Sequence, residues 1–246
     1  MTCALCLREE QLKFSHIIPE FLYKSLYDDK HRFHVISSKP DSKNALWQKG
    51  AREYLLCDDC ETHLSKYEDY GSQILNGGIE LEVRQEKSIL FISGIDYKRF
   101  KLFQLSILWR AGVSTLPMFS KVELGPHEEE MRKMVLDDDP GPALKYPCIT
   151  WLITLGPRAS DGLIMQPTKT RVVNQRGYKF MFGGILWSYV VSKDPPAHPL
   201  ALCILNEKGE TIMQLKHVSE MRDLVEFMKS VDDQDKNPLK TREPYK

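Results

Sequence analysis

The sequence lacks any apolar run approaching the roughly 18 residues that a membrane-spanning helix needs. The residues Met1-Thr2-Cys3 also do not open a secretory signal peptide. These two absences predict a cytoplasmic protein that does not associate with membranes. In that compartment the six cysteines are expected to be thiols and metal ligands, because cytosolic proteins seldom keep disulfides.

An excess of either charge is also lacking, because Lys plus Arg equals Asp plus Glu, at 34 each. Proteins that coat duplex nucleic acid are usually basic. Any nucleic-acid binding must therefore rest on local patches, on a partner protein or on a metal. No internal repeat or low-complexity tract appears, and 246 residues suffice for one large domain or two small ones.

Two Cys-x-x-Cys pairs, Cys3/Cys6 and Cys57/Cys60, are the most informative feature that is present. Four thiolates arranged as two knuckles satisfy tetrahedral Zn²⁺, which prefers soft sulfur ligands. All four positions would be filled by protein, so the predicted role of the zinc is structural. The alternative is four buried thiols that are paired by chance.

The residues between and after these pairs suggest a short series of elements. The pattern predicts a strand at Gln11–Phe14 delivering His16, a short helix from Pro19, a polar loop over Asp28–Asn44, a strand at Tyr54–Leu56, and a helix from Asp58 that stops at Gly71. Strand, long loop, strand and helix is the order of a ββα-metal module.

Three segments resemble the zinc-stapled HNH endonucleases: Cys3-x-x-Cys6, Ser15-His16-Ile17-Ile18-Pro19, and Leu55–Glu61. In that family a strand carries acid-His-Ile-x-Pro, and a helix begins with Cys-x-x-Cys followed by Asn or His. The resemblance covers roughly the first 70 residues. It implies a metal-dependent endonuclease that hydrolyses phosphodiester bonds in DNA, of a type common in bacterial antiphage defence systems.

The resemblance also implies roles for two residues. His16 matches the histidine that activates water, and Glu61 matches the helix residue that binds a catalytic Mg²⁺ or Mn²⁺. Phosphodiester cleavage needs a base that works near neutrality and a hard cation, for which a carboxylate is a suitable ligand. For His16 the alternative is a histidine at the edge of the core, bonded to backbone.

The sequence departs from the family pattern at two positions. Ser15 stands where an acidic metal ligand is usual, and Asn44 is the one nearby counterpart of the family's middle asparagine. Glu53 and Glu68 are candidates to compensate. Glu61 and Glu68 are seven residues apart and so share one helix face, although for Glu68 alone a solvated helix flank is the favoured interpretation.

His63 is a further candidate metal ligand, because it lies three residues after Cys60 on the same predicted helix face. It could replace a cysteine at the zinc or serve in a second metal site. A partly exposed helix histidine is the alternative.

The composition changes at Asn76-Gly77-Gly78, which predicts a boundary between residues 1–76 and residues 77–246. The second part is expected to be α+β. Its predicted elements are two helices at Tyr97–Gly112 and Pro126–Asp137, strands from Ile149 onward, a hairpin around Asn206–Gly209 and core positions for Cys148 and Cys203. Basic and aromatic residues interleave from Lys169 to Trp187, which fits either a sheet facing nucleic acid or a half-buried sheet.

The leading hypothesis is thus an α+β protein with an N-terminal zinc-stapled nuclease module acting on DNA. Residues 77–246 would bind substrate, effector, a partner protein or a second copy of the chain. The competing hypothesis is a non-catalytic zinc-binding module, for protein interaction or nucleic-acid binding, on a degenerate HNH scaffold.

Overall fold

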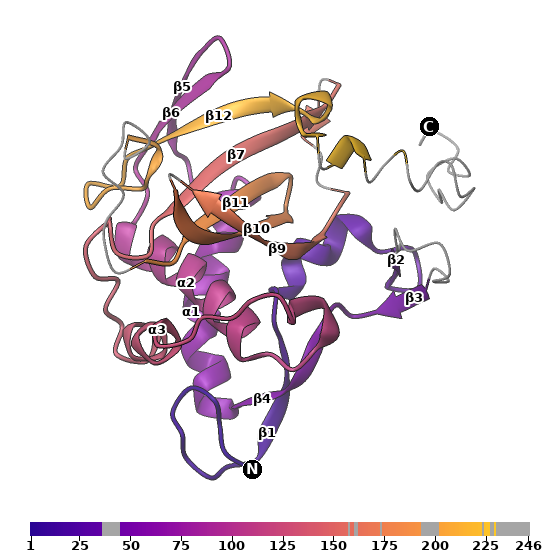
Figure 1. Cartoon of the computed structure of the whole chain (residues 1–246), viewed down its shortest axis with the longest axis vertical. Helices are drawn as coiled ribbons and strands as arrows, with labels where there is room; N and C mark the ends of the chain where they lie inside the picture. The colour runs from indigo at the N-terminus through magenta and orange to yellow at the C-terminus, as the bar shows by residue number, and fades with distance from the viewer. Residues whose placement is uncertain are drawn as a thin grey trace.

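The computed structural model describes residues 1–35, 45–156, 158–159, 162–172, 174–192, 202–222, 224–226 and 229. These residues form an α+β structure, as predicted, with a ββα unit at the N-terminus and a mostly antiparallel sheet that follows. The helices α1 (Asp58–Leu75), α2 (Tyr97–Val113) and α3 (His127–Leu136) lie together on one side of the sheet, and the two strands of the ββα unit extend beyond them (Figure 1).

The N-terminal unit consists of β1 (Leu12–His16), β4 (Arg52–Cys57) and α1 (Asp58–Leu75). Strands β1 and β4 pair antiparallel, and α1 follows β4 without a loop. The predicted order of strand, connection, strand and helix is therefore confirmed. The connection begins with a 3-10 helix, η1 (Glu20–Leu26), where a short helix was predicted.

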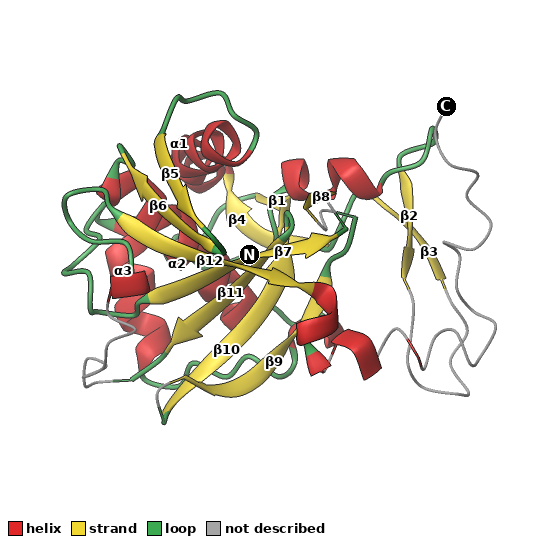
Figure 2. Ribbon diagram, turned by 90° about the horizontal axis from the view of Figure 1, so that it is seen from above, coloured by secondary structure: helices red, strands yellow, loops and turns green. Residues whose placement is uncertain are grey.

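The predicted polar loop over Asp28–Asn44 is wrong in its described part. Strand β2 (Arg32–Val35) pairs antiparallel with β3 (Ala45–Gln48), and this hairpin projects from the body of the molecule (Figures 1 and 2). Arg32-Phe33-His34-Val35 does alternate polar and apolar residues, with Phe33 buried, but the run is only four residues long and was overlooked.

Helix α1 continues to Leu75, past the glycine at which it was predicted to stop. Gly71 is buried against α2, and a Cβ atom there would lie 2.7 Å from the Phe103 ring. This glycine therefore allows two helices to approach closely, and the helix ends instead at Asn76, whose backbone N–H donates to the Ser72 carbonyl at 2.9 Å.

Helix α2 (Tyr97–Val113) is the central element of the structure, and every residue from Phe100 to Ala111 is buried. Its N-terminus is capped by the Asp96 side chain, which accepts a hydrogen bond from the Arg99 N–H at 3.0 Å. A helix that is apolar around most of its circumference was predicted to be buried, and this is confirmed. Helix α3 (His127–Leu136) packs beside it, after η2 (Pro117–Phe119).

The sheet has the strand order β5-β6-β12-β7-β11-β10-β9, with β8 paired to the end of β7. All pairs are antiparallel except β12 with β7, which is parallel. The strands are β5 (Glu82–Glu86), β6 (Ile89–Ser93), β7 (Cys148–Leu155), β8 (Arg158–Ala159), β9 (Met165–Val172), β10 (Gln175–Phe182), β11 (Ile185–Val190) and β12 (Thr211–His217), which leads into η4 (Val218–Glu220).

The predicted hairpin around Asn206–Gly209 is wrong. Within its described first arm, Ile204 forms an isolated bridge to Ile149, and β12 pairs with β6 and β7 instead. The turn itself exists, since the Asn206 N–H donates to the Glu210 carbonyl at 2.9 Å. The chain leaves the turn for strands that are distant in sequence, which a local pattern cannot indicate.

One apolar core runs through the molecule, with buried members from Cys3 to Leu205, on both sides of the predicted boundary at Asn76. Cys148 is buried in it, and Cys203 is partly buried. The aromatic residues of the interleaved stretch, Tyr178, Phe180, Phe182 and Trp187, are also buried, which favours the half-buried sheet. Across the described residues, no helix combines the length and apolarity needed to cross a membrane.

Candidate metal centre and active site

The four cysteines predicted to bind zinc come together. The Sγ atoms of Cys3, Cys6, Cys57 and Cys60 all lie within 4.8 Å of one another, and those of Cys6 and Cys57 are 3.8 Å apart. A tetrahedron with Zn–S bonds of about 2.3 Å places its sulfurs about 3.8 Å from each other. The cluster therefore has the donor set and the size of a structural zinc site.

Backbone and side-chain donors point at these sulfurs from the surrounding turns. The Cys57 N–H donates to the Cys3 Sγ at 3.3 Å, and the Arg8 Nε donates to the Cys6 Sγ at 3.4 Å. Cys57 caps the N-terminus of α1 and Cys60 lies in its first turn, where the helix dipole favours thiolates. Donors of this kind orient metal-bound thiolates and spread their negative charge.

The acidities of the thiols are consistent with this arrangement. Burial raises the pKa of the Cys60 and Cys57 thiols, whereas at Cys6 the hydrogen bonds from Arg8 overcome burial and lower the pKa to about 6. Four sulfurs so close together cannot all ionise without a cation. A bound Zn²⁺ would supply the compensating charge and deprotonate the ligands on binding.

His63 lies outside the cysteine cluster. Its Nε2 atom is 2.8 Å from the Val135 carbonyl oxygen and 3.5 Å from the Asp138 Oδ1, and its ring packs edge-on against Tyr67. The side chain thus joins α1 to the end of α3. Among the described residues, the four cysteines form the one group of three or more His, Cys, Asp or Glu side chains whose ligand atoms lie close enough together to hold a metal ion.

The His16 ring lies at the end of β1, partly buried. Its Nε2 is 2.9 Å from the Lys49 carbonyl oxygen, so an Nε2–H tautomer donates to that carbonyl and leaves the Nδ1 lone pair as an acceptor. Burial lowers the pKa of His16, which keeps the imidazole neutral near pH 7. A neutral, oriented imidazole is the form that a general base requires.

Glu61 and Ser15 face each other between α1 and β1. Ser15 is buried, and its hydroxyl accepts a hydrogen bond from the Leu56 N–H at 3.1 Å and donates to the Lys13 carbonyl at 3.3 Å. Burial raises the pKa of Glu61, against the opposing effects of the Ser15 hydroxyl and the Arg110 guanidinium. The Glu61 Oε1 atom is buried and has no hydrogen-bond partner in the described part of the chain.

Arg110 connects the ββα unit to α2. Its side chain is 2% exposed, and its Nη1 lies 2.6 Å from the Glu68 Oε1 and 2.8 Å from the His16 carbonyl oxygen. Its Nε donates to the Ser106 carbonyl at 3.2 Å. One buried guanidinium thus fixes both Glu68 and the backbone of the candidate base. Glu68 is 25% exposed and ion-paired, rather than a fully solvated flank.

Glu53 turns away from His16 to hold the segment after α2. Its carboxylate accepts hydrogen bonds from the Ser114 hydroxyl, from the Thr115 hydroxyl at 2.7 Å, and from the Thr115 N–H at 3.2 Å. Asn44, the remaining predicted site residue, lies outside the described residues.

One face of the β1–β4 ribbon presents aromatic and basic groups beside His16. Phe14 pairs across the strands with Tyr54, and His16 pairs with Arg52 two positions further along, which is the next pair on the same face. The rings of Phe14 and Tyr54 have centroids 5.1 Å apart and are 48% and 63% exposed, and the Arg52 guanidinium lies 4.8 Å from the Phe14 centroid. Exposed aromatic pairs next to a guanidinium are suited to stacking on unpaired bases.

Sequence reasoning missed Arg110 and this aromatic face. Arg110 directly follows the apolar run Ile107-Leu108-Trp109, and this was the available signal, because a buried guanidinium requires a partner. The chain was compared with protein-family models, with curated proteins and with solved structures, and none of them matches it.

Proposed function

We propose that this protein is a metal-dependent nuclease of the ββα-metal type that hydrolyses phosphodiester bonds in DNA. The observation that carries the proposal is the place of His16. It ends the first strand of a ββα unit, one ring nitrogen is bonded to a backbone carbonyl, and the carboxylate-bearing face of α1 lies close by.

In the proposed mechanism, His16 removes a proton from the attacking water. The Lys49 carbonyl holds Nε2–H, so Nδ1 is the atom that accepts this proton. The low pKa of the buried ring keeps Nδ1 free of a proton at neutral pH. Arg110 is a positioning residue, because its guanidinium is bonded to the His16 carbonyl and to Glu68.

The residues on α1 fit a hard cation. Glu61 has a buried oxygen without a hydrogen-bond partner among the described residues, and burial raises its pKa, so a divalent ion would relieve an unfavourable state. Glu61, together with Glu68, would hold Mg²⁺ or Mn²⁺, and such an ion supplies charge stabilisation at the leaving oxygen. Zn²⁺ in the cysteine cluster is assigned a structural role, since its four ligands leave no open position.

The substrate side of the proposal rests on the face formed by Phe14, Tyr54 and Arg52. It offers stacking and a positive charge next to the proposed base, although the chain as a whole has a formal net charge of +0. We therefore include in the proposal a partner protein, or a second copy of the chain, that helps deliver DNA. The biological setting that the resemblance suggests, antiphage defence, is part of the same proposal.

A second candidate function is favoured by one observation at the same site. The Ser15 hydroxyl is used by backbone groups, and Glu68 is already paired with a permanent cation, Arg110. A chain whose cation position is filled by a guanidinium would be a zinc-stapled module for binding nucleic acid or protein, without cleavage.

A nicking assay with metal analysis separates the two functions. Purified protein is incubated with supercoiled plasmid and Mg²⁺ or Mn²⁺, beside His16→Ala, Glu61→Ala and the control His34→Ala, which removes an exposed histidine from β2. The nuclease proposal expects nicking by wild type and His34→Ala alone. Zinc without nicking under any divalent metal would support the second function, and nicking by His16→Ala would refute the assigned base.

A further inference from the structure

A cavity of about 150 Å³ lies between the sheet and the helices, and its wall includes the last residues of α1. Its wall is formed largely by apolar side chains, among them Ile74, Phe100, Ile185, Trp187, Leu205 and Met213. None of the described residues that line the cavity has a charged side chain. An apolar cavity of this size accommodates a molecule with a single aromatic ring.

Two polar side chains on opposite walls lack hydrogen-bond partners within the described residues. Gln104 of α2 is 3% exposed and Thr150 of β7 is 6% exposed, and both line the cavity. In the described part of the chain, no hydrogen bond involves the Gln104 amide or the Thr150 hydroxyl. A buried amide without partners costs free energy, and such a group in a native structure usually serves a ligand or ordered water.

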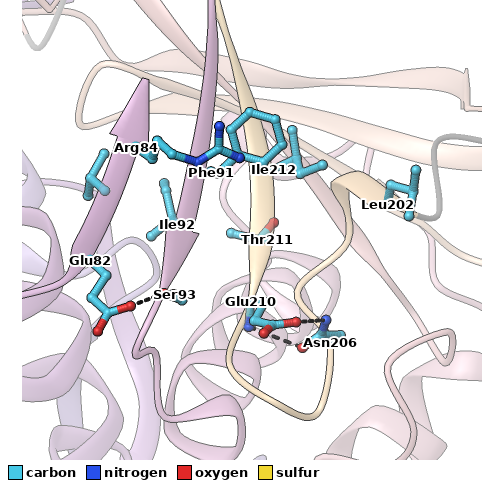
Figure 3. A pocket seen from close by; sticks show the side chains of 11 residues that line it. Glu82, Arg84, Phe91, Ile92, Ser93, Leu202, Asn206, Glu210, Thr211 and Ile212 are labelled. Carbon is cyan, nitrogen blue, oxygen red and sulfur yellow. Dashed lines mark hydrogen bonds between the residues drawn. The ribbon is translucent and has the colours of Figure 1, made fainter. Parts of the chain in front are cut away.

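The cavity shares two of its lining residues with a groove on the surface. Ile92 and Thr211, which are cross-strand partners in β6 and β12, line both the cavity and a groove of about 650 Å³ on the outside of the molecule. Figure 3 shows these two side chains at the groove, between Arg84 and Phe91 on one side and Asn206 and Glu210 on the other. Ile92 and Thr211 therefore lie between the cavity and the groove.

We infer that this cavity is a binding site for a small, uncharged, mainly aromatic molecule that carries one amide-like or hydroxyl group. The apolar wall and the size select a single ring, the absence of charged lining excludes an ion, and Gln104 offers a donor and an acceptor to one polar edge. The inference does not rest on the proposed nuclease function, since no residue of the cavity belongs to the candidate active site.

The probes are benzamide and toluene, which share a ring and differ in the amide. Binding is followed by methyl NMR, with the isoleucine resonances of Ile74 and Ile185 reporting on the cavity itself. Wild type should bind benzamide about two- to tenfold more tightly than toluene, the range expected for one hydrogen bond. Gln104→Met keeps the length of the side chain and removes the amide, so this preference should disappear.

Gln73→Met, on the exposed side of α1, is the matched control and should bind as wild type does. Should Gln104→Met fail to fold, Thr150→Val removes the second polar group with little change in shape, and it should weaken benzamide binding relative to toluene. The inference is overturned if neither probe shifts the two isoleucine resonances in wild type, as a water-filled cavity would predict. It is equally overturned if the preference for benzamide persists in the folded variant.

Discussion

Replacing Arg110 with methionine should destabilise the protein more than the loss of any other ion pair that α2 forms among the described residues. The guanidinium is 2% exposed and contacts both the Glu68 carboxylate, at 2.6 Å, and the His16 carbonyl, at 2.8 Å. Removing one partner of a buried ion pair typically costs about 3–5 kcal/mol, because the other charge stays buried and unpaired. Glu68 retains 25% exposure, so water screens part of its charge and the lower value, about 3 kcal/mol, is expected.

The measurement is urea unfolding of wild type, Arg110→Met, Glu68→Gln and the double variant, with zinc present throughout. Two residues in direct contact should show a coupling energy of about 2 kcal/mol, so the double variant should be more stable than the sum of the single changes predicts. Arg99→Met is the matched control, since Arg99 is on the same helix, is 62% exposed and should change stability by about 0.5 kcal/mol or less.

An Arg110→Met protein whose stability is within about 1 kcal/mol of wild type, or a coupling energy near zero, would refute this role of the buried ion pair. Arg110→Lys separates charge from geometry. A lysine keeps the positive charge and loses the planar fork that serves Glu68, His16 and Ser106 together, so it should recover only part of the lost stability.

Four further predictions concern other parts of the molecule. Cys57→Ser should lose stoichiometric zinc and expose the first 70 or so residues to protease, and a variant that keeps tight zinc and full resistance would contradict the four-cysteine site. Because burial lowers the pKa of His16, the nicking rate should stay level as the pH falls from 8 to about 6.5 and should decrease only below that value. A decline that begins above about pH 6.5 would count against His16 as the base. Burial also lowers the pKa of Lys101 to about 8, so between about pH 8 and 10.5 the unfolded chain holds a proton on this lysine that the folded protein has released. As the pH rises through that range, the free energy of unfolding of wild type should increase by up to about 3 kcal/mol relative to that of Lys101→Met. Parallel pH-stability curves for the two proteins would exclude this. Tyr54→Ala should weaken binding of single-stranded DNA by about 1–3 kcal/mol in fluorescence anisotropy, whereas Tyr54→Phe should bind as wild type does, and equal affinities for all three would remove the stacking role.

The features that sequence reasoning predicted correctly are those with a fixed local spacing. The two Cys-x-x-Cys pairs indicated a four-sulfur site because tetrahedral zinc constrains its ligands, and the sulfurs do converge. The burial of α2 followed from an apolar circumference. In the first case the determining information is the spacing within each Cys-x-x-Cys pair, and in the second it is the composition of one continuous helix.

The features that were missed depend on contacts between distant residues. Gly71 looks like a helix end in the sequence and is instead the point at which Phe103 of another helix passes. The partner of Glu68 is Arg110, which is 42 positions further along the chain and could not be chosen from among many basic residues. The hairpin expected at Asn206–Gly209 failed because β12 is parallel to β7, a pairing that requires a crossover rather than a turn.

The position of β12 has a consequence for synthesis on the ribosome. Among the described strands, β5 and β6 are joined to the rest of the sheet through β12 alone, although β12 is made more than 50 residues after β7 begins. A nascent chain that has emerged only as far as Asn206 carries two half-sheets with unpaired edges, at β6 and β7. The four cysteines, in contrast, are complete once residue 60 has emerged. Metal loading therefore precedes closure of the sheet in the order of synthesis, and the interval before β12 emerges is the one in which this chain most needs protection from edge-to-edge aggregation.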